Sequence, residues 1–152
     1  VLERAKQDPP PSPHSDIEQA DIDRVFSLPS AAAIRKALAT SEMPYAARAL
    51  KGLDAGAPLS VACALAMVRS ARSNSGLRDA LKTEYRFTHR AMEHGDFLEG
   101  IRAQVIDKDR TPAWKHDGLD AVRPEEVTEM LAPLGADELT FEDTAKAGED
   151  TQ

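Results

Sequence analysis

The segment PLSVACALAMV, which begins at Pro58, is apolar on nearly every side when it is wound into a helix. A helix of this kind is stable only when other structure encloses most of its surface. No stretch of the chain approaches the roughly 20 apolar residues that cross a membrane. We therefore predict a central buried helix over about 58–72. Because it needs cover on so many sides, we expect that some of its neighbours lie outside this chain.

The residues before this segment predict three shorter helices. Ser15 and Glu18 have the spacing of a capping box, in which each side chain closes a free amide at a helix start. A second helix is expected over 30–40, and Pro44 suits the first turn of a third over about 44–55. Helical spacing places these apolar residues inward: Ile17, Ala20, Val25, Leu28, Ile34 and Leu38.

Three more helices are expected downstream. An apolar stripe predicts an amphipathic helix whose inward residues are Leu77, Leu81, Tyr85, Thr88 and Met92. Asp96 and Glu99 repeat the capping-box spacing before a helix with an inner face of Phe97, Ile101 and Val105. Pro124 begins a short helix that ends near Leu131. Segments 104–106 and 139–141 are too short to argue strands, so the sequence predicts an all-α fold of six or seven helices.

The expected helical domain covers residues 15–141. Closely spaced prolines stop any helix begun at Val1, so we interpret residues 1–14 as a helix end and a proline-rich linker. The acidic tail, 142–152, lacks large apolar residues and is expected to be disordered. The chain starts without Met and in helix-like sequence, which suggests a piece of a longer protein.

The charge balance argues against two classes of partner. The chain has 19 basic and 26 acidic residues and a net charge of −7, whereas nucleic acids and anionic membranes are bound through cationic surface. We expect neither as a partner, although a specific anion site is compatible with this balance. The single cysteine, Cys63, cannot form an internal disulfide, which fits a soluble protein in a reducing compartment.

Neither a nucleotide cradle nor a metal site is predicted. The eight glycines are all isolated, so no glycine-rich loop brings consecutive amides to a phosphate. The four histidines lack the spacing of metal ligands. Residues 107–109 superficially suggest a calcium loop, but Pro112 stands where that loop requires glycine. Cys63 lies in the most apolar helix and is expected to pack in the core with its proton retained.

One charged segment is a candidate for binding. Lys108, Arg110 and Lys115 around Trp114 would suit a phosphorylated ligand, because cations attract phosphate and an indole can stack on a base. The alternative is an ordinary solvated turn. Composition and spacing assign no catalytic residue.

Residues 77–114 closely resemble the C-terminal region of 3-hydroxyisobutyryl-CoA hydrolases, a branch of the enoyl-CoA hydratase/isomerase (crotonase) superfamily. The most specific pieces are EYR at 84–86, DF at 96–97, EGIRA at 99–103 and IDKD at 106–109, followed by Pro112 and Trp114. The IDKD form points to the hydrolase branch. Ala57 replaces the usual Ser before Pro58, and the following helix departs from the family pattern. The resemblance covers about residues 15–141.

The resemblance implies that this chain is the C-terminal helical part of a crotonase-like fold whose ββα spiral core is absent from it. In such enzymes the oxyanion pocket and the catalytic acidic residues belong to the N-terminal half, so no catalytic residue is carried over. The implied partners are that N-terminal core, from the same gene or on a separate chain, and an acyl-CoA substrate. No separate cofactor is implied, because the substrate carries coenzyme A. The implied CoA-binding residues are Lys108 and, more weakly, Arg102 and Phe97, for which structural roles are the favoured alternative.

The implied reaction is hydrolysis of a short β-hydroxyacyl-CoA thioester in valine breakdown, with the chain alone inactive. Hydration or isomerisation of an enoyl-CoA is an alternative within the superfamily. A non-catalytic helical interaction module is the other; it predicts a polar surface, whereas part of an enzyme predicts an exposed apolar patch. The alanine- and arginine-rich composition suggests a bacterial cytoplasm, and a eukaryotic source would imply the mitochondrial matrix.

Overall fold

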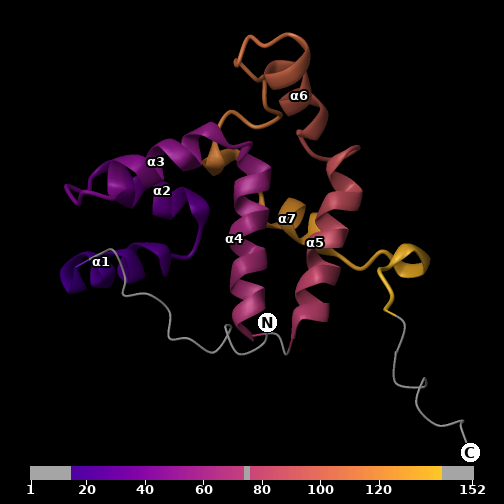
Figure 1. Cartoon of the computed structure of the whole chain (residues 1–152), viewed down its shortest axis with the longest axis horizontal. Coiled ribbons are helices and arrows are strands. Elements are labelled where there is room, and N and C mark those ends of the chain that lie inside the picture. Colours follow the sequence, from indigo (N-terminus) through magenta and orange to yellow (C-terminus); the bar gives the residue numbers. More distant parts are fainter. Residues whose placement is uncertain (1–14, 74–75, 142–152) are drawn as a thin grey trace, which may run out of the picture.

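The computed structural model describes residues 15–73 and 76–141, and within these ranges its regular elements are all helical. The expected all-α class is confirmed. Our predictions for 1–14 and 142–152 lie outside the described residues. The α-helices of the described part are α1 (Asp16–Phe26), α2 (Ala31–Ala39), α3 (Ala46–Ala55), α4 (Pro58–Ser73), α5 (Leu77–Ala91), α6 (Phe97–Ile101) and α7 (Pro124–Leu131), as Figure 1 shows.

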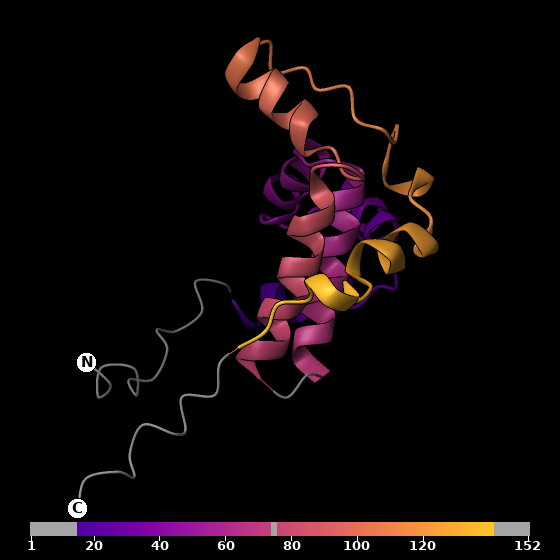
Figure 2. The same ribbon diagram turned by 90° about the vertical axis from the view of Figure 1, so that its right-hand side faces the viewer.

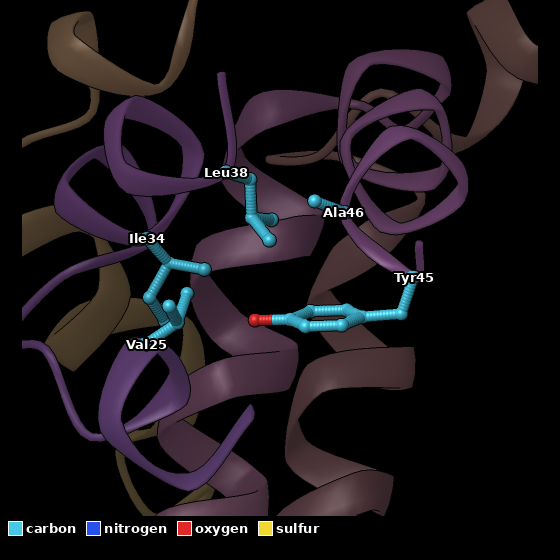
Figure 3. Packing of buried hydrophobic residues seen from close by; sticks show 5 residues of the cluster. All are labelled: Val25, Ile34, Leu38, Tyr45 and Ala46. Carbon is cyan, nitrogen blue, oxygen red and sulfur yellow. The ribbon is translucent and has the colours of Figure 1, made fainter. Parts of the chain in front are cut away.

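The first three helices form one cluster (Figure 1). Ser15 and Ser30 cap α1 and α2, because their hydroxyls accept the backbone N–H groups three residues on, at 3.3 and 3.1 Å. The third helix begins at Ala46, slightly later than the expected start at Pro44. The core of this cluster consists of the side chains that Figure 3 shows: Val25, Ile34, Leu38, Tyr45 and Ala46.

Tyr45 contributes the one hydroxyl of this core. Its ring lies between the helices with its oxygen toward α1 (Figure 3), and it donates to the Asp21 carboxylate at 2.9 Å. Burial, together with that carboxylate, raises the pKa of Tyr45 to about 12. The hydroxyl therefore stays protonated and ties α1 to the start of α3. The predicted burial of Ile34 and Leu38 is confirmed.

The second cluster is built on α4. The helices α4 and α5 lie side by side in opposite directions, and α7 packs against both (Figures 1 and 2). The buried side chains of this second cluster are Leu59, Cys63 and Met130. Burial raises the pKa of Cys63 to about 11, so this thiol is a protonated core residue, as predicted. The predicted bounds of α7, from Pro124 to Leu131, are confirmed.

The described chain leaves one strip of the central helix α4 uncovered. Pro58, Leu59 and Cys63 are buried, whereas Val68 is 58% exposed. A groove of about 290 Å³ runs between α4 and α5, lined mainly by small and apolar side chains: Ala64, Met67, Val68, Ala71 and Ala80. No single helix of the described part is long and apolar enough to span a membrane; α3 with α4 would be, but for a 119° bend between them. The helix thus lacks, within the described chain, the neighbours that its composition requires.

The inward face expected for α5 is wrong. All five of its stripe residues are exposed, with exposed fractions of 74% for Leu77, 36% for Leu81, 37% for Tyr85 and 51% for Met92. Thr88 is exposed as well. The opposite side of the helix packs instead: Phe87 lies against the buried cluster of Leu59, Cys63 and Met130. Arg90, on the same side, donates to the Met130, Ala132 and Pro133 carbonyls at the end of α7. Ile17 and Ala20 of α1 are likewise exposed, contrary to our expectation.

The helix expected after Asp96 also differs. Asp96 makes no side-chain cap to α6, and its carboxylate accepts the Lys115 backbone N–H at 2.9 Å, so the second capping box is wrong. The α-helix stops at Ile101 and continues as a π-helical segment, η2 (Arg102–Ile106). The change of helical period breaks the expected inner face, and both Phe97 and Val105 are exposed.

A matched pair of valine substitutions compares the buried Val25 of α1 with the exposed Val68 of α4. Val25 is 0% exposed and Val68 is 58% exposed. We expect Val25→Ala to lower the free energy of unfolding by about 2 kcal/mol, since buried methylene-sized groups contribute roughly 0.8 kcal/mol each and a cavity remains. Val68→Ala should change it by less than about 0.5 kcal/mol. Urea unfolding followed by circular dichroism measures both, and equal losses would contradict the exposure of α4.

Candidate functional site

The three residues with predicted CoA-binding roles lie on one projecting arm. We call residues 97–113 the arm: it comprises α6, η2 and the extended segment after them, and it stands away from the two helical clusters (Figures 1 and 2). Phe97 lies at its start and is half-exposed, Arg102 lies at the junction of the two helical segments, and Lys108 lies exposed beyond them.

Arg102 is the centre of the arm. Its Nε and Nη2 donate to the two Glu99 carboxylate oxygens at 2.9 and 2.8 Å. Its Nη1 donates to Asp107 at 2.6 Å and to Asp109 at 2.7 Å, and Nη2 also donates to the Thr111 carbonyl at 3.2 Å. A guanidinium has five N–H donors, so this set of partners inside the arm matches its full capacity.

These contacts shift the ionisation of the groups involved. The hydrogen bonds from Arg102 and then from the Ala113 backbone N–H lower the pKa of Glu99 to about 2. The same guanidinium lowers the pKa of Asp109, and the pKa of Arg102 itself is raised by its carboxylate partners. Glu99, Asp109 and Arg102 are therefore charged at neutral pH. The one guanidinium is shared among the carboxylates of Glu99, Asp107 and Asp109.

The backbone beyond η2 is strained. Lys108 and Arg110 both have φ of 57°, a left-handed conformation that costs a residue other than glycine roughly 1–2 kcal/mol. The Arg110 N–H donates to the Ala103 carbonyl at 3.0 Å, and the Thr111 N–H donates to Asp109 at 2.9 Å. Both cationic side chains are exposed, and neither has a side-chain hydrogen bond or ion pair to another described residue. The structure thus brings two cations to the tip of the arm.

The third cation of the predicted cluster lies elsewhere. Lys115 is at the base of the arm, where its Nζ donates to the His94 carbonyl at 3.1 Å. Trp114 approaches the backbone of Gly100 and lines a separate hollow of about 450 Å³ near the start of α4. Lys115 is thus engaged by a backbone carbonyl at the base of the arm, whereas the side chains of Lys108 and Arg110 are exposed.

Sequence reasoning missed the roles of Asp107 and Asp109. The two carboxylates are partners of Arg102, five and seven residues away, and no periodic pattern indicates such contacts across a strained turn. It also missed the pair of His116 Nε2 and Glu126 Oε1, 3.1 Å apart, which joins the loop after the arm to α7. No group of three His, Cys, Asp or Glu side chains within 15–73 and 76–141 could hold a metal ion.

Comparison with protein families and curated sequences gives a consistent result. The model of the family described as enoyl-CoA hydratase/isomerase matches residues 1–131. The mitochondrial 3-hydroxyisobutyryl-CoA hydrolase of Gallus gallus is 35% identical over 118 residues, and that of Mus musculus is 34% identical over 120 residues. These alignments cover 78% and 79% of this chain but only 30% and 31% of the relatives. The chain thus spans about a third of their length.

Two solved structures share the fold. An enoyl-CoA hydratase from Rhodobacter sphaeroides is 45% identical, with a TM-score of 0.78 over 92% of this chain and 42% of that one. A carnitinyl-CoA dehydratase from Mycobacterium thermoresistibile is 34% identical, with a TM-score of 0.74 over 90% of this chain and 38% of that one. Each likeness covers at least 90% of this chain.

Titration of Glu99 tests the arm directly. Its pKa is depressed in the folded state, so its charge stabilises the arm above the ordinary value of 4.5, and this contribution is lost as the pH falls toward about 2. We expect carboxyl-carbon NMR to give Glu99 a pKa near 2, and Arg102→Gln to return it toward 4.5. The control Arg35→Gln, which removes a guanidinium paired with Asp54 on the other cluster, should leave Glu99 unchanged. A pKa of Glu99 near 4.5 in the unaltered protein would contradict its hydrogen bonds with Arg102.

Proposed function

The chain belongs to the enoyl-CoA hydratase/isomerase family, and from this membership we propose that it is the C-terminal helical part of an acyl-CoA thioester hydrolase acting on 3-hydroxyisobutyryl-CoA. The identity to hydrolases of that name supports the substrate, and the IDKD segment of the arm supports the hydrolase branch. The mitochondrial relatives support the mitochondrial matrix as the location if the source is eukaryotic. The alanine- and arginine-rich composition is the support for a bacterial cytoplasm as the alternative location.

The observation that carries this proposal is the uncovered apolar surface of α4 and α5. Val68 and the stripe of Leu77, Leu81 and Tyr85 expose apolar side chains that a self-contained soluble module would bury. The curated relatives hold about two thirds of their length outside the matched region. We assign this surface to contact with a catalytic core, on the same chain or a separate one, which the helices cover.

The reaction chemistry belongs to that core. Hydrolysis requires donors placed where negative charge develops on the thioester oxygen, and a carboxylate that positions the attacking group. The carboxylates of the arm do not suit such a role, because Glu99, Asp107 and Asp109 are already paired with Arg102. This chain instead closes the substrate site and supplies Lys108 and Arg110 to the CoA phosphates, and coenzyme A arrives as part of the substrate. Phe97 of the arm is a further candidate contact.

Two alternatives differ in class. Enoyl-CoA hydration is favoured by the names of the two similar structures, a hydratase and a dehydratase. A non-catalytic interaction module would keep the helical scaffold without a core. The exposed apolar surface argues against the module, and the assays below separate the two reactions.

The activity is tested by expressing this chain alone and continuous with the coding sequence upstream of Val1. We expect the longer protein to hydrolyse 3-hydroxyisobutyryl-CoA faster than it hydrates crotonyl-CoA, and the 152-residue chain to catalyse neither. Thiol release measures hydrolysis, and the buried Cys63 adds no background. Turnover by the 152-residue chain alone would refute the assignment of the chemistry to a core. Hydration of crotonyl-CoA faster than hydrolysis of 3-hydroxyisobutyryl-CoA would favour the alternative function, an enoyl-CoA hydratase.

Substitution of Lys108 tests the role of the arm tip in that longer enzyme. We expect Lys108→Ala to raise KM for the acyl-CoA about tenfold with little change in kcat, because a charge-assisted contact to phosphate contributes roughly 1.5–3 kcal/mol to binding. The acyl-pantetheine substrate, which lacks the nucleotide phosphates, should show no change. Lys36→Ala on α2 is the matched control at an exposed site. An unchanged KM for the acyl-CoA would contradict the phosphate contact.

A further inference from the structure

The arm combines three unusual features that the packing of the bundle does not require. The helix becomes π-helical at Arg102, and Lys108 and Arg110 beyond it have left-handed backbone. The guanidinium of Arg102 donates its hydrogen bonds to acceptors within the arm. Strained residues and π-helical turns persist only where surrounding contacts hold them, and they concentrate at functional sites. The contacts that hold this strain converge on Arg102.

The sequence of the turn shows what would happen without that arginine. Acidic and basic residues alternate as Asp107, Lys108, Asp109 and Arg110, so each cation has a carboxylate next to it along the chain. In the structure both carboxylates bind Arg102, and neither cation is paired with them. Arg102 therefore separates the charges of the turn, with carboxylates gathered on its guanidinium and the two cations left to solvent.

We propose that Arg102 is a positioning residue: by binding Asp107 and Asp109 it holds Lys108 and Arg110 in the left-handed turn as a preorganised pair of cations for the phosphates of the acyl-CoA. The ligand in this inference rests on the function proposed above, whereas the ordering of the turn does not. Arg102 acts through the turn and does not touch the substrate. This explains how a residue within a family motif can govern substrate binding while all its contacts are internal.

The geometry also predicts which substitutions fail. Lysine has three N–H donors on one nitrogen and cannot bind Glu99 in a bidentate manner while it holds two further carboxylates and the Thr111 carbonyl. Arg102→Lys should therefore restore only part of the order. Removing the guanidinium leaves three carboxylates close together, and Asp107 and Asp109 are then free to pair with the neighbouring cations.

The first experiment measures the order of the turn in the 152-residue chain, without any ligand. Trypsin cleaves after exposed lysine and arginine when the backbone can adopt an extended form, so cleavage of the Arg110–Thr111 bond reports on the turn. We expect Arg102→Gln to accelerate this cleavage at least tenfold and Arg102→Lys to accelerate it less. Cleavage after Lys36 and Lys51, on α2 and α3, is the internal control and should not change. An unchanged rate at Arg110 would overturn the proposal.

The second experiment measures binding in the longer enzyme. We expect Arg102→Gln to raise KM for the acyl-CoA about tenfold, to leave kcat within about twofold, and to leave KM for the acyl-pantetheine unchanged. When Arg102→Gln is added to the double variant Lys108→Ala with Arg110→Ala, KM for the acyl-CoA should increase little further, because the effects of residues that act through one another are not additive. A fully additive effect, or a loss of kcat with both substrates, would overturn the positioning role.

The outcomes separate this inference from the function on which it rests. If Lys108→Ala and Arg110→Ala raise KM for the acyl-CoA but Arg102→Gln does not, the phosphate site stands and the positioning role falls. If none of the three raises KM while Arg102→Gln still loosens the turn, the proposed phosphate site falls, and with it the ligand named here. Should Arg102→Gln fail to fold by circular dichroism, Asp107→Asn with Asp109→Asn loosens the same turn and replaces it in both experiments.

Discussion

The structure depends on the central helix α4, whose apolar surface must be covered by other elements. Almost every side of α4 is apolar, and the other elements of the described chain are arranged along it: α2, α5, α7 and the short turn η3 (Leu119–Ala121) all contact it. They cover the side that carries Leu59 and Cys63 and leave the side of Val68 open. Because water disfavours apolar surface roughly in proportion to its area, this uncovered side is the strongest physical reason to place the chain against a larger body.

Arginines hold the parts of the molecule together where its core is small. Arg69 donates to the Phe26, Leu28 and Pro29 carbonyls and fastens the turn between α1 and α2 to α4. Arg90 closes the end of α7 in the same way, and Arg102 closes the arm. A planar guanidinium offers several donors in fixed directions, so one side chain can satisfy several orphan acceptors at the end of a helix or in a turn. With an aromatic content of only 5%, the chain joins short helices through such contacts as much as through apolar packing.

The two helical clusters and the arm therefore have different roles in the proposed enzyme. The helices α4 and α5 present an apolar surface to a catalytic core, and the arm presents cations to the charged end of a CoA substrate. The negative net charge of −7 does not conflict with anion binding, because the arm separates opposite charges locally instead of relying on the overall field. This division is consistent with the proposal that the catalytic groups lie in the core and not in this chain.

Local sequence was sufficient for the ends of α1, α2 and α7, since Ser15, Ser30 and Pro124 act over three or four residues. It was not sufficient for the start of α6 or for the π-helical segment that follows it. It was also sufficient for the burial of Ile34 and Leu38 and, through the motifs of the arm, for the family. It was not sufficient for the orientation of α5. Periodicity shows which face of a helix is apolar, but whether that face is covered depends on the neighbouring elements. In α5 the face that carries Phe87 and Arg90 packs against the buried residues of α4 and the end of α7. The contact of Arg102 with Glu99 follows from a spacing of three residues. Its contacts with Asp107 and Asp109 depended on the fold, because they require the turn that begins at Asp107 and has left-handed backbone at Lys108 and Arg110.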